Sequence, residues 1–187
     1  IPFEQAFDKI AFRQDLQPTG QYLLLDGYSR GKHLHYDGNA ILKLSDQGED
    51  WLVDGDYLVR NTTEHTMVSV IRDGRAEKLV PECAGLLHEA NLPGFGLTET
   101  QVKDYNGVDW RRDIFWRKGE WFVLIDRLLA RQPGDYRLDC VFKCVDAGRE
   151  ELVTPQRFRI SRGGLHRFGS YGLERTQAAD GSRSAAV

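Results

Sequence analysis

The chain has 187 residues and a mass of 21.3 kDa, enough for one large domain or two small ones. Its 41% hydrophobic and 28% charged residues exclude a collagen, a wholly disordered chain and a membrane bundle, and no apolar run approaches the roughly 20 residues of a membrane-spanning helix. The net charge of −3, from 25 basic and 28 acidic residues, provides no basic field for binding nucleic acid.

The two ends of the chain differ from its body. Ile1 is not a start methionine, and no signal peptide precedes the first strand-like segment, Lys9–Arg13. We therefore expect a fragment or mature piece of a longer protein. From Gln177 to Val187 the sequence is Ala, Ser, Gly and charged residues without periodicity, which predicts a flexible tail (177–187) after one domain (1–176).

The body of the chain is predicted to be strands. Short runs of apolar and β-forming residues recur near every tenth residue, separated by turn pairs such as Asp37-Gly38, Gln47-Gly48 and Asn106-Gly107. This spacing predicts a single all-β domain, an antiparallel sandwich or barrel. The further predicted strands are Tyr22–Leu25, Ala40–Leu44, Trp51–Val53, Met67–Ile71, Gly85–Ala90, Trp110–Trp116, Glu120–Ala130, Tyr136–Cys144 and Leu152–Ile160.

Histidines and carboxylates gather between residues 28 and 75. His33 and His35 are two positions apart, and in an extended segment their side chains point to the same side, some 6–7 Å apart. Asp54 and His65 follow downstream, and a His, an Asp and a second His make a plausible zinc set. The competing interpretation is that these are ordinary surface polar groups, because a His-x-His pair alone is a weak pattern.

The zinc set requires a particular chain path. A hairpin turning near Gln47-Gly48 would place Asp54 opposite Ala40, roughly 17 Å along the strand from His35. The site forms only if the chain folds back at the Asp37-Gly38 turn.

Two families resemble this stretch. Gly55-Asp56 and His65 resemble the metal motif of the cupins, but the Glu that cupins place after the second His is missing at Asn39–Ile41. This resemblance is partial, and it implies a cupin-like metal-binding module.

The second resemblance is more extensive. It rests on three successive motifs and a later stretch: His33-x-His35-x-Asp37-x-Asn39; Trp51-Leu52-Val53-Asp54; His65-Thr66-Met67-Val68 with Asp73-Gly74; and Asp113–Phe142. Over about residues 9–160 the chain resembles the heparinase II/III-like domain of polysaccharide lyases. The resemblance implies an antiparallel β-sandwich of the super-sandwich type, preceded in the whole protein by an N-terminal α/α toroid that this chain lacks.

The heparinase-like resemblance also implies roles for individual residues. It makes His33 the catalytic histidine and His35, Asp54 and His65 the ligands of a structural zinc. Tyr57 is the one tyrosine between Asp54 and His65, so it is the expected catalytic phenol, with Tyr36 as the other nearby candidate.

The implied activity is β-elimination on a uronate-containing anionic polysaccharide such as alginate or a glycosaminoglycan. Three nearby cations are expected to meet substrate carboxylates or sulfates: Arg30, Lys32 and Arg60. The implied location is periplasmic or secreted, and the fragment is expected to be catalytically incomplete. A non-catalytic carbohydrate-binding sandwich is the further alternative.

Overall fold

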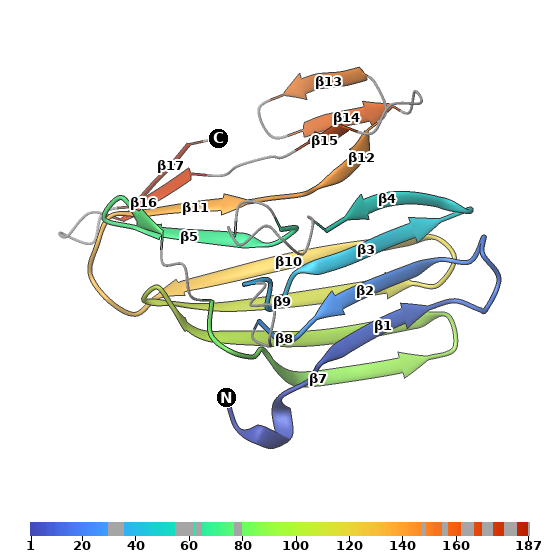
Figure 1. The fold of residues 1–187 in the computed structure, drawn as a ribbon, viewed down its shortest axis with the longest axis horizontal. Helices are drawn as coiled ribbons and strands as arrows, with labels where there is room; N and C mark the ends of the chain where they lie inside the picture. The colour runs from blue at the N-terminus through green and yellow to red at the C-terminus, as the bar shows by residue number, and fades with distance from the viewer. Residues whose placement is uncertain are drawn as a thin grey trace.

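The computed structural model of the chain describes residues 1–29, 36–54, 62, 65–76, 80–146, 149–154, 157–161, 167–169, 174–177 and 183–186, with side chains as far as Lys143. Apart from the short 3-10 helix η1 (Phe3–Gln5), every regular element in these ranges is a β-strand (Figure 1). All strand pairs among the described residues are antiparallel, and the predicted all-β antiparallel class is confirmed. No helix in the described ranges has the length and apolar character needed to cross a membrane.

One layer is a four-stranded sheet with the order β10-β9-β8-β7. Its strands follow one another in the chain through tight turns, and in the turn between β8 and β9 Asn106 (φ 50°) and Gly107 (φ 83°) both adopt the left-handed backbone of a two-residue hairpin loop. The strands are β7 (Gly85–Leu92), β8 (Phe95–Tyr105), β9 (Val108–Arg117) and β10 (Trp121–Ala130). Of these, β8 was not among the predicted strands.

The facing layer contains a six-stranded sheet and a three-stranded sheet. The six-stranded order is β1-β2-β3-β4-β12-β15, and the three-stranded order is β11-β5-β6. Their strands are β1 (Lys9–Arg13), β2 (Tyr22–Asp26), β3 (Ile41–Asp46), β4 (Glu49–Val53), β5 (Val68–Arg72), β6 (Arg75–Ala76), β11 (Tyr136–Cys140), β12 (Cys144–Asp146) and β15 (Arg167–Gly169).

The C-terminal part of the described chain adds two hairpins. They pair β13 (Arg149–Thr154) with β14 (Arg157–Ser161), and β16 (Glu174–Gln177) with β17 (Arg183–Ala186). The predicted runs Tyr136–Cys144 and Leu152–Ile160 are thus each divided into two strands. Where the sequence predicts an aperiodic tail from residue 177, Gln177 pairs with Arg183; the mobility of that tail stays a prediction.

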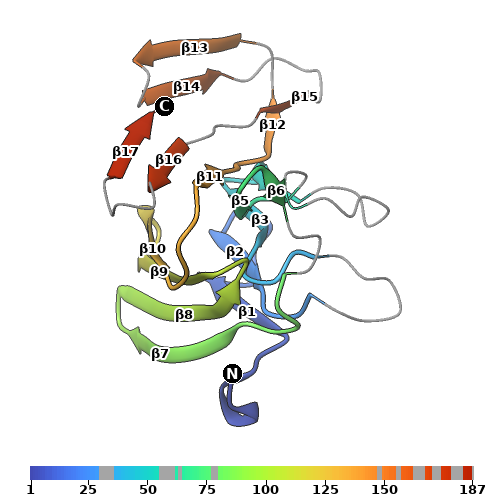
Figure 2. The ribbon, with the colours of Figure 1, turned by 90° about the vertical axis from the view of Figure 1, so that its left-hand side faces the viewer.

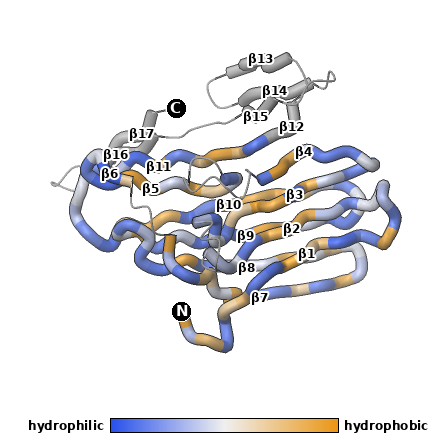
Figure 3. Tube along the Cα trace, in the orientation of Figure 1, coloured by the Kyte–Doolittle hydropathy of each residue, from blue (hydrophilic) through white to orange (hydrophobic). Residues whose placement is uncertain are grey.

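The core lies between the two layers. Over one half of the four-stranded sheet, β1–β3 bury Phe12, Leu23, Leu25 and Ile41 against Ile114 and Trp116. Apolar residues recur along β1, β2 and β3 (Figure 3), and Figure 2 shows these strands stacked on the four-stranded sheet.

Over the other half of the four-stranded sheet, β5 and β11 contribute a second buried cluster that includes Trp110. Open sheets stacked face to face form a sandwich, and among the described strands β7 and β10 remain edges of the four-stranded sheet, unlike strands of a closed barrel.

Candidate functional site

The centre of the site is a contact between Asp54 and His65. Asp54 directly follows β4, and its N–H donates to the carbonyl of Leu42 (2.9 Å), so it lies opposite Leu42 rather than opposite Ala40 as the sequence predicted. The turn, in which Asp46 pairs with Glu49, accounts for one residue of this two-residue shift, and a bulge in the β3–β4 pairing between Leu44 and Ser45 accounts for the other. His65, fully buried just before β5, places Nδ1 at 2.9 Å and 3.1 Å from the two carboxylate oxygens of Asp54.

Asp54 is further fixed from the β5 side. The N–H of Thr66 donates to Asp54 Oδ1 (3.3 Å), and the hydroxyl of Thr66 donates to the carbonyl of Val53 (3.1 Å). Two chain segments that are eleven residues apart are therefore joined through side-chain and backbone hydrogen bonds. The sequence prediction that Asp54 and His65 lie together agrees with this geometry.

A second carboxylate, Asp37, completes the cluster. It begins a tight turn in which the N–H of Ala40 donates to the carbonyl of Asp37 (2.8 Å) and Asn39 has a left-handed backbone (φ 69°). The chain thus turns where the sequence predicted a fold-back. One ligand atom from each of Asp37, Asp54 and His65 can be chosen so that all three lie within 4.8 Å of one another.

The environment of Asp37 disfavours a free carboxylate. The residue is 2% exposed, and within the described part of the chain its Oδ1 has no hydrogen-bond partner. Burial, together with the negative charges of Asp26 and Asp54, raises the pKa of Asp37 to about 7, against the opposing effect of His65. A buried carboxylate in this situation needs either a proton or a cation.

The three residues fit a divalent metal ion. Two carboxylates and one imidazole are zinc ligands, and a mixed nitrogen and oxygen set favours zinc over calcium or magnesium. A cation at the cluster would neutralise both carboxylates and give the orphaned Asp37 oxygen a partner. The sequence analysis did not assign Asp37 as a ligand, although its spacing of two residues from His35 was a usable signal.

A buried arginine holds the turn that carries Asp37. The Arg112 side chain is 1% exposed; Nε and Nη2 donate to the two carboxylate oxygens of Asp126 (2.8 and 3.0 Å), and Nη1 donates to the carbonyl of Asn39 (2.8 Å). Thr100 donates from its hydroxyl to Asn39 Oδ1 (2.7 Å), and Trp110 Nε1 donates to Asp126 (2.7 Å). The four-stranded sheet therefore fixes the position of Asn39, two residues after Asp37.

Ser29 anchors the beginning of the same region. Tyr36 donates its N–H to the Ser29 carbonyl (3.3 Å), and Gly38 donates its N–H to Ser29 Oγ (2.7 Å). Residues 29 and 36, which flank the segment with both histidines of the His-x-His pair, are thus bound to each other. The Tyr36 side chain is half-buried and packs against the core cluster around Trp110.

The remaining predicted site residues lie outside the described residues: Arg30, Lys32, His33, His35, Tyr57 and Arg60. Their assignments stay predictions. Among the tryptophans of the four-stranded sheet, which could stack on sugar rings, Trp110 and Trp116 are buried in the core, whereas Trp121 is 44% exposed.

The fold was compared with known proteins. No family model matches the sequence, and no curated protein matches it. Among solved structures, it is similar to a heparan sulfate lyase, HepC from Pedobacter heparinus (15% identity, TM-score 0.67, 96% of this chain and 27% of that one). It is also similar to a heparinase III (14% identity, TM-score 0.67, 97% and 32%) and to another heparinase III structure (13% identity, TM-score 0.69, 92% and 27%).

The predicted resemblance to heparinase-like proteins is therefore confirmed at the level of the fold. This chain spans about a quarter to a third of the length of these structures.

Proposed function

We propose that this chain is the β-sandwich portion of a polysaccharide lyase that cleaves a uronate-containing anionic polysaccharide by β-elimination. One observation carries the proposal: a fold similar to heparinase III structures brings together Asp54 and His65, the two described members of the expected ligand set. The whole protein includes, in this proposal, an N-terminal α/α toroid, and it acts in the periplasm or outside the cell, where such polymers are found.

A structural zinc is the proposed cofactor. His35, Asp54 and His65 would hold it together with Asp37, which the buried, orphaned Oδ1 supports. When bound, the ion supplies positive charge and a cross-link between chain segments that are far apart in the sequence. Because its ligands come from separate loops, metal binding would add directly to the stability of the sandwich.

The proposed reaction removes the proton on the carbon next to the uronate carboxylate. The electrons of that C–H bond form a carbon–carbon double bond as the bond to the 4-linked sugar oxygen breaks, and the leaving oxygen takes a proton. The carbon is weakly acidic, so the negative charge of the uronate carboxylate must be neutralised while a correctly positioned base removes the proton. His33 and Tyr57 share base and acid duties in this scheme, and Arg30, Lys32 and Arg60 meet the substrate's anionic groups.

Chain connectivity supports this assignment. His33 is four residues before Asp37 and Tyr57 is three residues after Asp54, so chain length alone keeps their Cα atoms within about 14 Å and 11 Å of the Cα atoms of Asp37 and Asp54. Tyr36 packs against the core, which favours Tyr57 as the phenol that meets substrate. The toroid would supply the opposite wall of the cleft, so this chain alone is expected to turn over little or nothing.

The test uses the full-length protein and this chain in parallel. Product absorbance from the unsaturated uronate is followed on heparan sulfate, alginate and related uronate polymers, and zinc is measured by elemental analysis. We expect the full-length protein, but not this chain, to form product. We expect both proteins to contain near-stoichiometric zinc. Zinc and polysaccharide binding without any product from the full-length protein would replace the lyase proposal with the non-catalytic carbohydrate-binding sandwich.

A further inference from the structure

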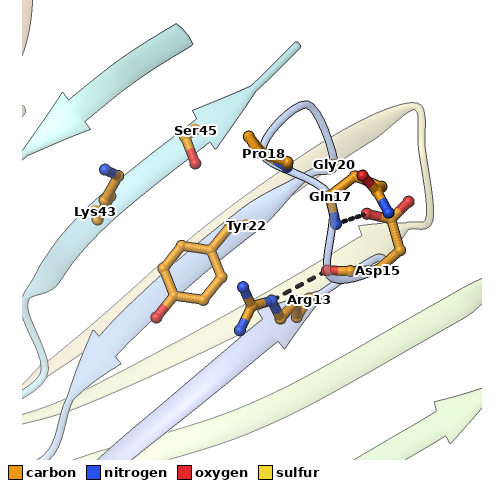
Figure 4. A pocket seen from close by; sticks show the side chains of 8 residues that line it. All are labelled: Arg13, Asp15, Gln17, Pro18, Gly20, Tyr22, Lys43 and Ser45. Carbon is orange, nitrogen blue, oxygen red and sulfur yellow. Dashed lines mark hydrogen bonds between the residues drawn. The ribbon is translucent and has the colours of Figure 1, made fainter. Parts of the chain in front are cut away.

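A pocket of about 280 Å³ lies away from the metal cluster, on the outer face of β1, β2 and β3 (Figure 4). Strand register builds it: Arg13 is opposite Tyr22, and Tyr22 is opposite Ser45, so the three side chains form a row across the sheet. Their chain neighbours Phe12, Leu23 and Leu44 pack into the core, and alternation turns this row outward. The loop that follows β1 forms the remaining wall, with Asp15 and Gln17.

The pocket presents a cation, Arg13, that forms no ion pair with a carboxylate of the described residues. The Arg13 guanidinium lies 5.5 Å from the centre of the Tyr22 ring, and its Nε donates to the Asp15 carbonyl (3.0 Å). No ion pair joins Arg13 to a carboxylate within the described residues, and the Asp15 carboxylate instead accepts from the backbone N–H of Gln17 (2.8 Å). Arg13 is thus held in place by one nitrogen and one ring contact, and neither terminal nitrogen has a hydrogen-bond partner in the described part of the chain.

A second cation lies on the other side of the tyrosine. Figure 4 shows the Tyr22 ring between the side chains of Arg13 and Lys43. Lys43 pairs with Asp50 (2.9 Å), but both side chains are more than 40% exposed, and an exposed ion pair of this kind contributes little and exchanges readily. An incoming anion can therefore compete for Lys43.

These groups select an anionic sugar. A guanidinium with two free terminal nitrogens binds a carboxylate or sulfate through two parallel hydrogen bonds, and a lysine adds a mobile point charge. The tyrosine ring offers an apolar surface for sugar C–H groups, and Ser45 and Gln17 offer partners for hydroxyls. The volume lies just below the roughly 300–1,000 Å³ of drug-sized sites, which suits one sugar unit rather than a longer segment.

We propose that this pocket is a remote subsite that binds one uronate or sulfated sugar unit of the polysaccharide through Arg13, Lys43 and Tyr22. The inference rests on the proposed function for its substrate class. Ser45 is three residues along β3 from Leu42, the hydrogen-bond partner of Asp54, which is about 10 Å of strand. The pocket therefore lies along the same strand as the residue that binds Asp54, at a separation that a polysaccharide chain spans. A contact this far from the reacting bond strengthens ground state and transition state equally, so it lowers KM without changing kcat.

The binding test uses the 187-residue chain, whose folding is checked by circular dichroism for every variant. A heparan sulfate tetrasaccharide and, in a separate arm, sodium sulfate are titrated by calorimetry into wild type, Arg13→Ala, Lys43→Ala and Arg117→Ala. Arg117 is the matched control, an exposed arginine on the opposite sheet. We expect Arg13→Ala to weaken tetrasaccharide binding about tenfold, the loss of a charge-assisted pair of hydrogen bonds, and Arg117→Ala to leave it unchanged.

Equal losses in Arg13→Ala and Arg117→Ala, or sulfate binding as tight as that of the tetrasaccharide, would overturn the subsite. In the full-length protein, Arg13→Ala is expected to raise KM about tenfold at unchanged kcat. A fall in kcat alone would also contradict a remote role. If the pocket binds the tetrasaccharide but the full-length protein forms no unsaturated product, the lyase proposal fails while the binding site stands.

Discussion

Replacing Asp37 by Asn tests the electrostatics of the candidate metal cluster. The substitution keeps the shape of the side chain and removes its charge. In the metal-free protein the carboxylate is 2% exposed, lacks a partner for Oδ1 among the described residues, and lies near Asp26 and Asp54. Removing that charge therefore stabilises the metal-free fold and weakens metal binding at the same time.

The magnitude follows from the pKa. Burial first, and then the nearby carboxylates, raise the pKa of Asp37 from 3.8 to about 7. A difference of about three corresponds to at most about 4 kcal/mol of lost stability once the folded protein is fully ionised, at about 1.4 kcal/mol per pKa step. A buried amide has its own hydrogen-bonding cost of about 1–3 kcal/mol, so we expect Asp37→Asn to gain about 1–3 kcal/mol at pH 8.

The pH dependence has a definite sign. The folded state holds this proton more tightly than the unfolded chain does, so the contribution of Asp37 to stability is fully present below pH 3.8 and is lost as the pH rises towards 7. Above pH 7 the loss is complete and constant. In Asp37→Asn this part of the decline disappears.

Urea unfolding after EDTA treatment, at pH 5 and pH 8, measures the effect. Excess zinc is then expected to stabilise wild type more than Asp37→Asn. Asp109→Asn is the matched control: burial alone would raise the pKa of Asp109, but hydrogen bonds from Lys103, the Asp104 backbone and Arg131 lower it, so this variant loses stability at pH 8. A metal-free Asp37→Asn protein no more stable than wild type at pH 8 would refute the electrostatic reasoning.

Three further predictions concern the cluster, its support and the chemistry. Asp54→Ala is expected to abolish zinc retention in elemental analysis, and wild-type zinc content in this variant would remove Asp54 from the ligand set. Arg112→Met is expected to cost about 3 kcal/mol in urea unfolding, because it leaves the carboxylate of Asp126, which is only 11% exposed, without its cation, and to lower zinc affinity by loosening the turn at Asn39. In the full-length protein, His33→Ala is expected to abolish product absorbance with zinc content unchanged, and wild-type turnover would contradict its catalytic role.

Most strands could be predicted from the sequence because apolar alternation and turn pairs are local signals. In the four-stranded sheet, these local signals miss one strand. The β8 strand was missed because its inward positions include Thr98 and Thr100, so the segment has no apolar run. Thr100 is buried because its hydroxyl has a partner, Asn39, that lies 61 residues away in the chain. When the hydrogen-bond partner of a buried polar residue is this distant in the sequence, the local sequence around that residue does not indicate that it is buried.

The candidate site also contains residues that were predicted from the sequence and one that was not. Asp54 and His65 could be paired from the sequence because their residue types suit zinc and the resemblance to a family supplied their roles, whereas Asp37, although part of one of its motifs, was given a role only in a turn. Both descriptions of Asp37 hold: its backbone carbonyl closes the turn with Ala40 while its carboxylate enters the cluster. Because the turn already explained an aspartate at position 37, the sequence offered no further reason to look for a role of its carboxylate.

Arg112 is the clearest case of a signal that was present but unused. The turn between β9 and β10 sets the register in which Arg112 is directly opposite Asp126, and alternation places both on the inward side, among Trp110, Ile114 and Leu124. Opposite charges at facing inward positions of one hairpin predict a buried ion pair from local sequence alone. The acceptor that gives the pair its further role, the Asn39 carbonyl, lies 73 residues away. Because a buried ion pair is weak support for stability in itself, its third hydrogen bond, to the turn beside Asp37, is the stronger reason for an arginine at this position.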